Sequence, residues 1–128
     1  MNDDHLALEG IGQISIRVHD IERATGFYRD ALRLRYLFAA PGMAFFDCGG
    51  VRLMLGTPSA PEFDHPASIL YYRVADIHAA HSALLARNVR CERGPERVAR
   101  TDAGELWLAF FRDSEANLLA LMSEVAPG

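Results

Sequence analysis

Apolar and polar residues alternate near the start of the chain. Within residues 12–18, one face of an extended chain would hold the apolar residues Ile14, Ile16 and Val18. The other face would hold the polar residues Gln13, Ser15 and Arg17. This period of two predicts a β-strand. Asp20 follows as a good helix N-cap, and apolar residues then recur every three or four positions from Ile21 to Ala31. That spacing predicts an amphipathic helix.

The same pattern returns 56 residues further on, with Asp76 in place of Asp20, and five of the eight positions 17–24 are identical to positions 73–80. The segments that follow also correspond, since 43–46 resembles 108–111 and 52–55 resembles 118–121. Each half therefore predicts a strand, a helix and three more strands. We expect an α+β fold of two tandem βαβββ modules.

The expected boundaries follow from this repeat. A flexible N-terminus at residues 1–10 precedes a single domain at 11–125. Within the domain, module one covers 11–56, a proline-containing linker covers 57–67, and module two covers 68–123.

Composition narrows the classes of function. The 128 residues are 50% apolar and carry a net charge of −4, which favours a globular domain and argues against a nucleic-acid-binding protein. There is no lysine, so Schiff-base and P-loop chemistry are excluded. No apolar run is long enough for a membrane span, and the acidic start lacks the features of a signal peptide. With only two cysteines, we expect a cytoplasmic protein.

The strand face away from the helices is the candidate functional surface. It holds a mixture of polar and apolar side chains: Gln13, Ser15, Arg17, Arg52, Met54, Tyr71, Leu118 and Ala120. A packed interface is more uniformly apolar, so the mixture suits a small-molecule pocket. A partly hydrated sheet face has the same pattern and stays open as an alternative.

Two segments resemble the vicinal oxygen chelate superfamily, the glyoxalase, bleomycin resistance protein and dioxygenase family. Residues 14–32 are similar to its opening strand and helix, and residues 110–118 to its closing hairpin. The resemblance covers residues 11–123 and implies the fold and a homodimer. This chain departs from the family where Arg33 replaces a common glycine, and where Ser114 and Ala116 replace proline and glycine. Because alanine disfavours a positive φ, Ala116 must either avoid that conformation or be strained, and we expect another type of turn there.

The resemblance also implies where a metal would bind. Carried over to this chain, the four ligand positions are Gln13, Met54, Ile69 and Ala120. Catalytic zinc sites use His, Asp, Glu or Cys, and none of these types stands there. We therefore predict no metal and no cofactor at this position.

Other groups have both a functional and a structural interpretation. His78 and His81 are spaced to share a metal on a helix, but a solvated helix face explains them better. Glu105 or Asp102 is a general-base candidate if burial raises its pKa, but a solvated position in a hairpin explains both acids better. Trp107 stacks on a planar ligand if it shares the face of Leu118 and Ala120, and otherwise belongs to the core or to a dimer interface. Cys48 beside Asp47 is predicted to be structural.

The leading hypothesis is a metal-free protein that binds a small molecule, with no assigned catalytic residue. Its predicted ligand-binding residues are Gln13, Ser15, Arg52, Met54, Ile69, Tyr71, Trp107 and Ala120. One alternative is a lyase, isomerase or dioxygenase-type enzyme with a non-standard metal site or metal-free acid–base catalysis. A second alternative is a dimeric interaction module whose mixed face is a seam between copies.

Overall fold

A computed structural model describes residue 6 and residues 8–127. The flexible N-terminus that the sequence predicts over 1–10 falls largely outside the described residues. In chain order the strands and helices are β1 (Gln13–Arg17), α1 (Ile21–Gly26), η2 (Phe27–Ala31), β2 (Arg35–Ala40), β3 (Met43–Cys48), β4 (Val51–Gly56), η3 (Pro61–Phe63), β5 (Leu70–Arg73), α2 (Ile77–Ala86), β6 (Cys91–Thr101), β7 (Gly104–Arg112) and β8 (Leu118–Val125).

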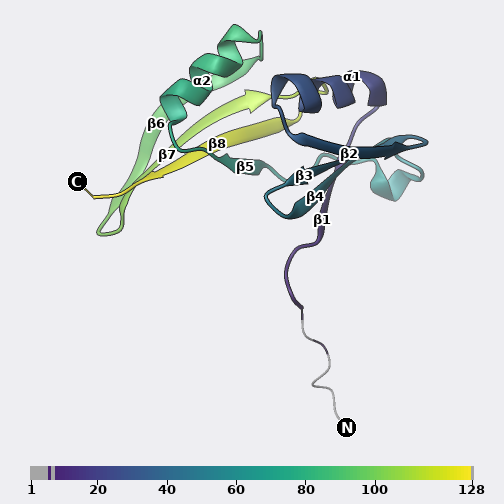
Figure 1. Cartoon of the computed structure of the whole chain (residues 1–128), viewed down its shortest axis with the longest axis horizontal. Helices are drawn as coiled ribbons and strands as arrows, with labels where there is room; N and C mark the ends of the chain where they lie inside the picture. The colour runs from purple at the N-terminus through teal and green to yellow at the C-terminus, as the bar shows by residue number, and fades with distance from the viewer. Residues whose placement is uncertain (1–5, 7, 128) are drawn as a thin grey trace.

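The α+β fold of two βαβββ modules is confirmed. Sheet A has the strand order β1-β4-β3-β2 and sheet B has the order β5-β8-β7-β6, so the two sheets share one topology. In both, the first strand is parallel to the last, and the other neighbours are antiparallel. Figure 1 shows both helices on the same side of the sheets, which leaves the opposite faces open.

Each predicted helix begins where the sequence places its cap. The Asp20 carboxylate accepts a hydrogen bond from the Arg23 N–H, and the Asp76 carboxylate accepts from the N–H groups of His78 and Ala79. The first helix differs from a regular α-helix after Gly26, because residues 27–31 form a wider π-helical turn.

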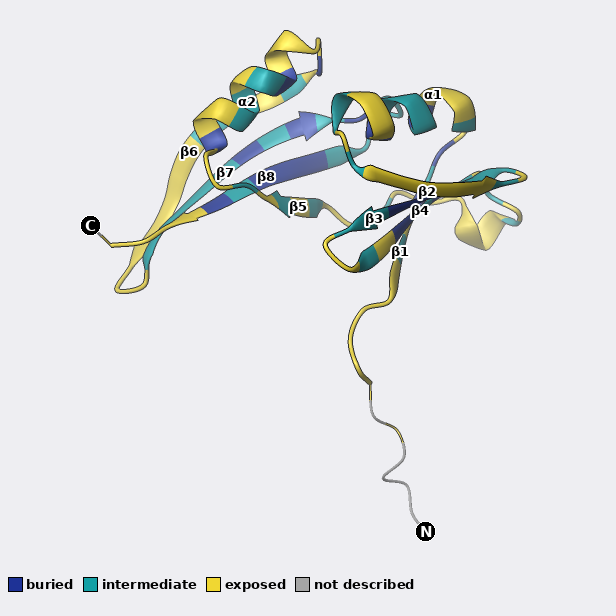
Figure 2. Ribbon diagram, in the orientation of Figure 1, coloured by how far each residue is buried: buried dark blue, intermediate teal, exposed yellow. Residues whose placement is uncertain are grey.

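Side chains from both modules form one core. Ile16 of β1 and Val18 just after it have no exposed surface, and they join a cluster that also contains Phe111 and Leu119 of sheet B. Figure 2 shows this burial in dark blue along the inner strands. The core lies between the sheets and the helices, so the other face of each sheet has no helix over it.

The backbone at two departures from the family keeps the left-handed conformation that favours glycine. Arg33 has φ 59° and Ala116 has φ 65°. The expectation of another type of turn at Ala116 is therefore wrong. The turn closes through an Ala116 N–H donated to the Asp113 carbonyl at 3.1 Å, and Asp113 Oδ1 accepts from the N–H groups of Glu115 and Asn117 at 2.8 Å each. These bonds hold the alanine in a strained conformation.

Candidate functional site

Four predicted ligand-binding residues lie together on the open face of sheet A. Gln13 and Ser15 of β1 pair in register with Arg52 and Met54 of β4. The Gln13 side-chain oxygen accepts a hydrogen bond from the Arg52 guanidinium at 2.8 Å, and its amide nitrogen lies 3.8 Å from the Met54 sulfur. The parallel β1–β4 pairing thus creates a compact polar group.

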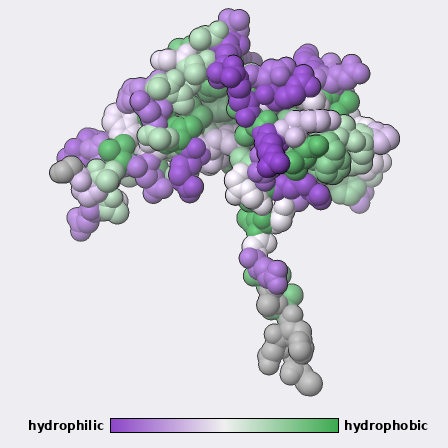
Figure 3. All heavy atoms as spheres, viewed as in Figure 1, coloured by the Kyte–Doolittle hydropathy of each residue, from purple (hydrophilic) through white to green (hydrophobic). Residues whose placement is uncertain are grey.

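Aromatic rings continue this face onto β3 and β2. Phe38 and Phe45 stack with their centroids 4.4 Å apart, and the Arg52 guanidinium carbon lies 5.0 Å from the Phe45 centroid. Phe38 is 46% exposed, so the stack is open to solvent at one side. Figure 3 shows apolar surface in green around β2. The Arg52 guanidinium near the Phe45 ring, together with the exposed Phe38 ring, suits the binding of a flat ligand.

A pocket of about 410 Å³ adjoins this group beneath the linker. Its lining includes Ser15 and Met54, and the linker adds Thr57 and Phe63 on the other side. The volume is in the range of small-molecule sites, roughly 300–1,000 Å³. The sequence did not indicate that the linker forms a wall, because residues 57–67 have no periodic pattern.

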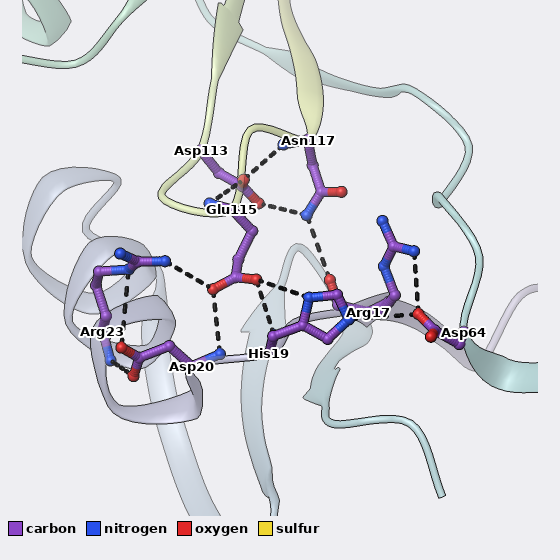
Figure 4. A network of polar contacts seen from close by, with 8 residues as sticks. All are labelled: Arg17, His19, Asp20, Arg23, Asp64, Asp113, Glu115 and Asn117. Carbon is purple, nitrogen blue, oxygen red and sulfur yellow. Dashed lines mark hydrogen bonds and ion pairs between the residues drawn. The ribbon is translucent and has the colours of Figure 1, made fainter. Parts of the chain in front are cut away.

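Asp64 ties the linker to module one. Its carboxylate accepts from the Arg17 guanidinium at 3.1 Å and lies 3.3 Å from His19 Nε2 (Figure 4). The hydrogen bonds from His19 and Arg17 hold the pKa of Asp64 below its ordinary value. The ionised carboxylate therefore keeps the linker, and Phe63 beside it, over the pocket.

Three other predicted residues belong to the open side of sheet B. Tyr71 pairs in register with Ala120, which corresponds to the Ser15–Met54 pair of module one. Tyr71 is 46% exposed and Ile69 is 41% exposed, whereas Ala120 is completely buried. The pocket beneath the linker contains none of these three residues. The predicted set is thus divided between the two modules.

Trp107 lies on the opposite face of sheet B from Ala120. Its register partner is Ser123, and its ring packs edge-on against His78 of α2 with centroids 5.2 Å apart. The condition for stacking on a ligand was that Trp107 share the face of Leu118 and Ala120, and the register places it on the helix side. We therefore leave Trp107 out of the candidate site.

Glu105 does not have the raised pKa that a general base requires. Its carboxylate accepts from the Trp107 indole N–H at 3.1 Å and from Arg100 at 3.0 Å. These bonds, and a further one from Arg97, lower its pKa. Asp102, the other candidate, lies exposed in the turn between β6 and β7. The condition for a general base, a pKa raised by burial, is therefore not met at Glu105.

The residues at the family's metal positions do not fit a divalent ion. Gln13 offers one amide oxygen that already accepts from Arg52, Met54 offers a thioether, and Ile69 and Ala120 offer no donor. Within residues 6 and 8–127, three or more His, Cys, Asp or Glu side chains do not converge anywhere as a possible metal site. We derive no chemistry through a metal.

The remaining reactive residue types have structural surroundings. Burial, with a contribution from Asp47, raises the pKa of the Cys48 thiol, so this cysteine is not activated as a nucleophile. His78 packs on Trp107, and His81 lies close to Gly94 of β6. The two histidines therefore face different neighbours on α2.

Solved structures with the same fold include proteins with different described roles. An antibiotic-binding protein, TnmS3 from Streptomyces sp. CB03234, is 24% identical with a TM-score of 0.76, and the match covers 94% of this chain and 100% of that one. Lactoylglutathione lyase from Agrobacterium tumefaciens is 19% identical with a TM-score of 0.73, covering 91% and 94% of the two chains. No curated protein sequence is similar enough to count as a match.

The sequence profile of the Glyoxalase/Bleomycin resistance protein/Dioxygenase superfamily matches residues 10–121. This range contains every strand and helix from β1 to β7 and half of β8. The duplicated modules and the shared sheet order agree with the match. The chain belongs to the glyoxalase, bleomycin resistance protein and dioxygenase superfamily.

Proposed function

We propose that this chain binds a planar aromatic small molecule with an acidic group on the open face of sheet A, without a metal. The observation that carries the proposal is the Arg52 guanidinium, which lies 5.0 Å from the Phe45 centroid beside the Phe38–Phe45 stack. An aromatic ligand can extend this stack. The pocket beneath the linker has room for the rest of such a molecule.

The charges on this face favour an acidic ligand. Arg17 is neutralised by Asp64 at 3.1 Å. Arg52 is hydrogen-bonded only to the neutral Gln13, and in the described part of the chain it forms no ion pair. A ligand carboxylate or sulfonate would therefore meet a free guanidinium with several donors. The similarity to an antibiotic-binding protein supports binding as the function.

Isothermal titration calorimetry with naphthalene-2-carboxylate tests this proposal, and naphthalene-2-carboxamide serves as the uncharged comparison. We expect the carboxylate to bind more tightly. Because the site is partly exposed, Arg52→Gln should weaken carboxylate binding by about three- to tenfold. Arg93→Gln is a matched control, since Arg93 of β6 pairs with Glu96 at 3.7 Å and lies in the other module.

Three results would contradict the proposal. They are equal binding of the acid and the amide, equal binding by Arg52→Gln and the unmodified chain, and loss of binding in the presence of a chelator. The chelator experiment tests metal independence directly, since the amide and thioether donors at Gln13 and Met54 cannot hold a hard ion.

Pairing of two chains is a second proposal, and a specific observation favours it. Phe38 and Tyr71 are large apolar residues on the open faces, and each is 46% exposed. A second copy would remove both from water. Sedimentation velocity tests this: a dimer that Phe38→Ser dissociates supports pairing, whereas a monomer at all concentrations excludes it. A dimer would also identify the open face as a seam between copies.

A further inference from the structure

Rows of register partners cross the open face of sheet A from strand to strand. The middle row joins one residue from each of the four strands: Ser15, Met54, Phe45 and Phe38. Arg52 stands two residues before Met54 on β4, and Arg17 stands two residues after Ser15 on β1. Residues two apart on a strand point to the same face of the sheet. The aromatic pair therefore belongs to a row with one arginine on each side of it.

The register also gives the separation of the two arginines. Arg17 is four residues beyond Gln13, which is the register partner of Arg52. A strand rises about 3.3 Å per residue, so the two backbone positions are about 13 Å apart along the sheet. This separation suits a ligand whose acidic groups stand at opposite ends of a two-ring aromatic system.

Arg17 has unused hydrogen-bond donors at the pocket beneath the linker. Its side chain lines this pocket with Ser15 and Met54, and it is 24% exposed. A guanidinium carries five N–H donors. In the part of the chain that the structure describes, the Arg17 side chain donates only from Nη1, to Asp64 at 3.1 Å. The end of a ligand that enters the pocket would therefore meet a cation that can donate further hydrogen bonds.

The present partner of Arg17 is itself a carboxylate, and it comes from the linker rather than from a strand. Asp64 is 47% exposed and also lies 3.3 Å from His19 Nε2 (Figure 4). An exposed ion pair of this kind contributes little to stability. A ligand carboxylate that makes two parallel hydrogen bonds with the Arg17 guanidinium would form the stronger contact. The position of Asp64 thus marks a place where an acidic group of a ligand can bind.

We propose that the ligand of the open face of sheet A carries two acidic groups, one at each end of its aromatic rings. One group binds Arg52, and the other binds Arg17 and replaces Asp64 there. This inference rests on the proposed function and extends it to the class of ligand. Asp64 then acts as an internal competitor: a ligand with one acid leaves the linker on Arg17, whereas a ligand with two acids releases it.

Isothermal titration calorimetry with naphthalene-2,6-dicarboxylate tests the inference. Naphthalene-2-carboxylate is the comparison with one acid, and naphthalene-2,3-dicarboxylate has the same charge with both acids at one end. We expect the 2,6-dicarboxylate to bind about three- to tenfold more tightly than either comparison. Equal affinity for the 2,6 and 2,3 isomers would overturn the inference, since total charge and not the spacing of the arginines would then determine binding.

Variants of the ion pair test the role of each partner. The quantity to compare is the ratio of the affinities for the 2,6-dicarboxylate and the monocarboxylate, because a disturbed linker changes both affinities alike. Arg17→Gln should abolish the advantage of the 2,6-dicarboxylate, and Asp64→Asn should increase it by about threefold. Arg93→Gln, in β6 of the other module, is the control that should leave the ratio unchanged. An unaltered ratio in Arg17→Gln or in Asp64→Asn would overturn the inference.

The same titrations separate failure of this inference from failure of the proposed function. If the monocarboxylate binds through Arg52 and the 2,6-dicarboxylate binds no more tightly, only the two-acid ligand is excluded. If Arg52→Gln binds the monocarboxylate as well as the unmodified chain does, the proposed function fails, and the inference fails with it.

Discussion

The hydrogen bond between Tyr28 and Asp113 joins the two modules inside the core, and its removal has a calculable cost. The phenol donates to the Asp113 carboxylate at 2.6 Å, Tyr28 has no exposed surface, and Asp113 is 6% exposed. A hydrogen bond to a charged group contributes about 1.5–3 kcal/mol. In Tyr28→Phe the carboxylate keeps three donors, from Glu115 and Asn117. We therefore expect a loss near the lower end, about 1.5–2 kcal/mol.

Urea unfolding measured by circular dichroism tests this value, with Trp107 fluorescence as a second probe. For a chain of this length the loss corresponds to a fall in melting temperature of about 5–10 °C. Tyr36→Phe is the matched control, because Tyr36 is 41% exposed and should lose less than about 0.5 kcal/mol. If Tyr28→Phe is as stable as the control, the hydrogen bond does not join the modules as described.

Three further predictions concern the backbone and pH. Ala116→Gly should stabilise the fold by about 0.5–1 kcal/mol, because relief of the left-handed strain exceeds the entropy cost of glycine. The control Ala79→Gly, within α2, should destabilise the fold by about 1 kcal/mol. The urea midpoint of unfolding measures both changes. Gly104→Ala should reduce the urea midpoint sharply, since φ is +130° and a Cβ would collide with the Val125 carbonyl oxygen. Burial opposes ionisation of Glu115, but the N–H groups of His19 and Asp20 and the Arg23 guanidinium hold its pKa below the ordinary 4.5. The ionised Glu115 therefore stabilises the fold fully above pH 4.5, and this stabilisation is lost as the pH falls through the lower pKa of the folded state. The difference in melting temperature between the unmodified chain and Glu115→Gln should therefore shrink in acid. A difference that is constant over the whole pH range would contradict this.

The internal repeat made the fold and part of the site predictable. The correspondence of 52–55 with 118–121 aligns Met54 with Ala120, and the observed strand pairs have that register. Gln13, Ser15, Arg52 and Met54 could be placed on one face because β1 alternates clearly between polar and apolar residues. Periodicity was sufficient wherever one face of a strand was polar.

Strand β7 shows where periodicity was insufficient. Residues 106–111 are all apolar, so alternation does not reveal which side faces α2. The repeat held the missing signal: Ala109 corresponds to the buried Ala44, and Trp107 is two residues before Ala109, on the same face. No comparable pattern in the sequence indicates that Phe63 lines the pocket or that Asp64 contacts module one. Both features depend on how the irregular linker folds back over sheet A.

The contacts of Glu115 have a consequence for how the chain folds during synthesis. Its carboxylate accepts from the N–H groups of His19 and Asp20 at the start of α1, and the Asp20 contact spans 95 residues of sequence (Figure 4). All of module one is synthesised before this partner exists. Contacts of such long range form late, because the loop that they close is costly in entropy. Translation must therefore reach Glu115 in the second module before the first helix gains its final capping contacts.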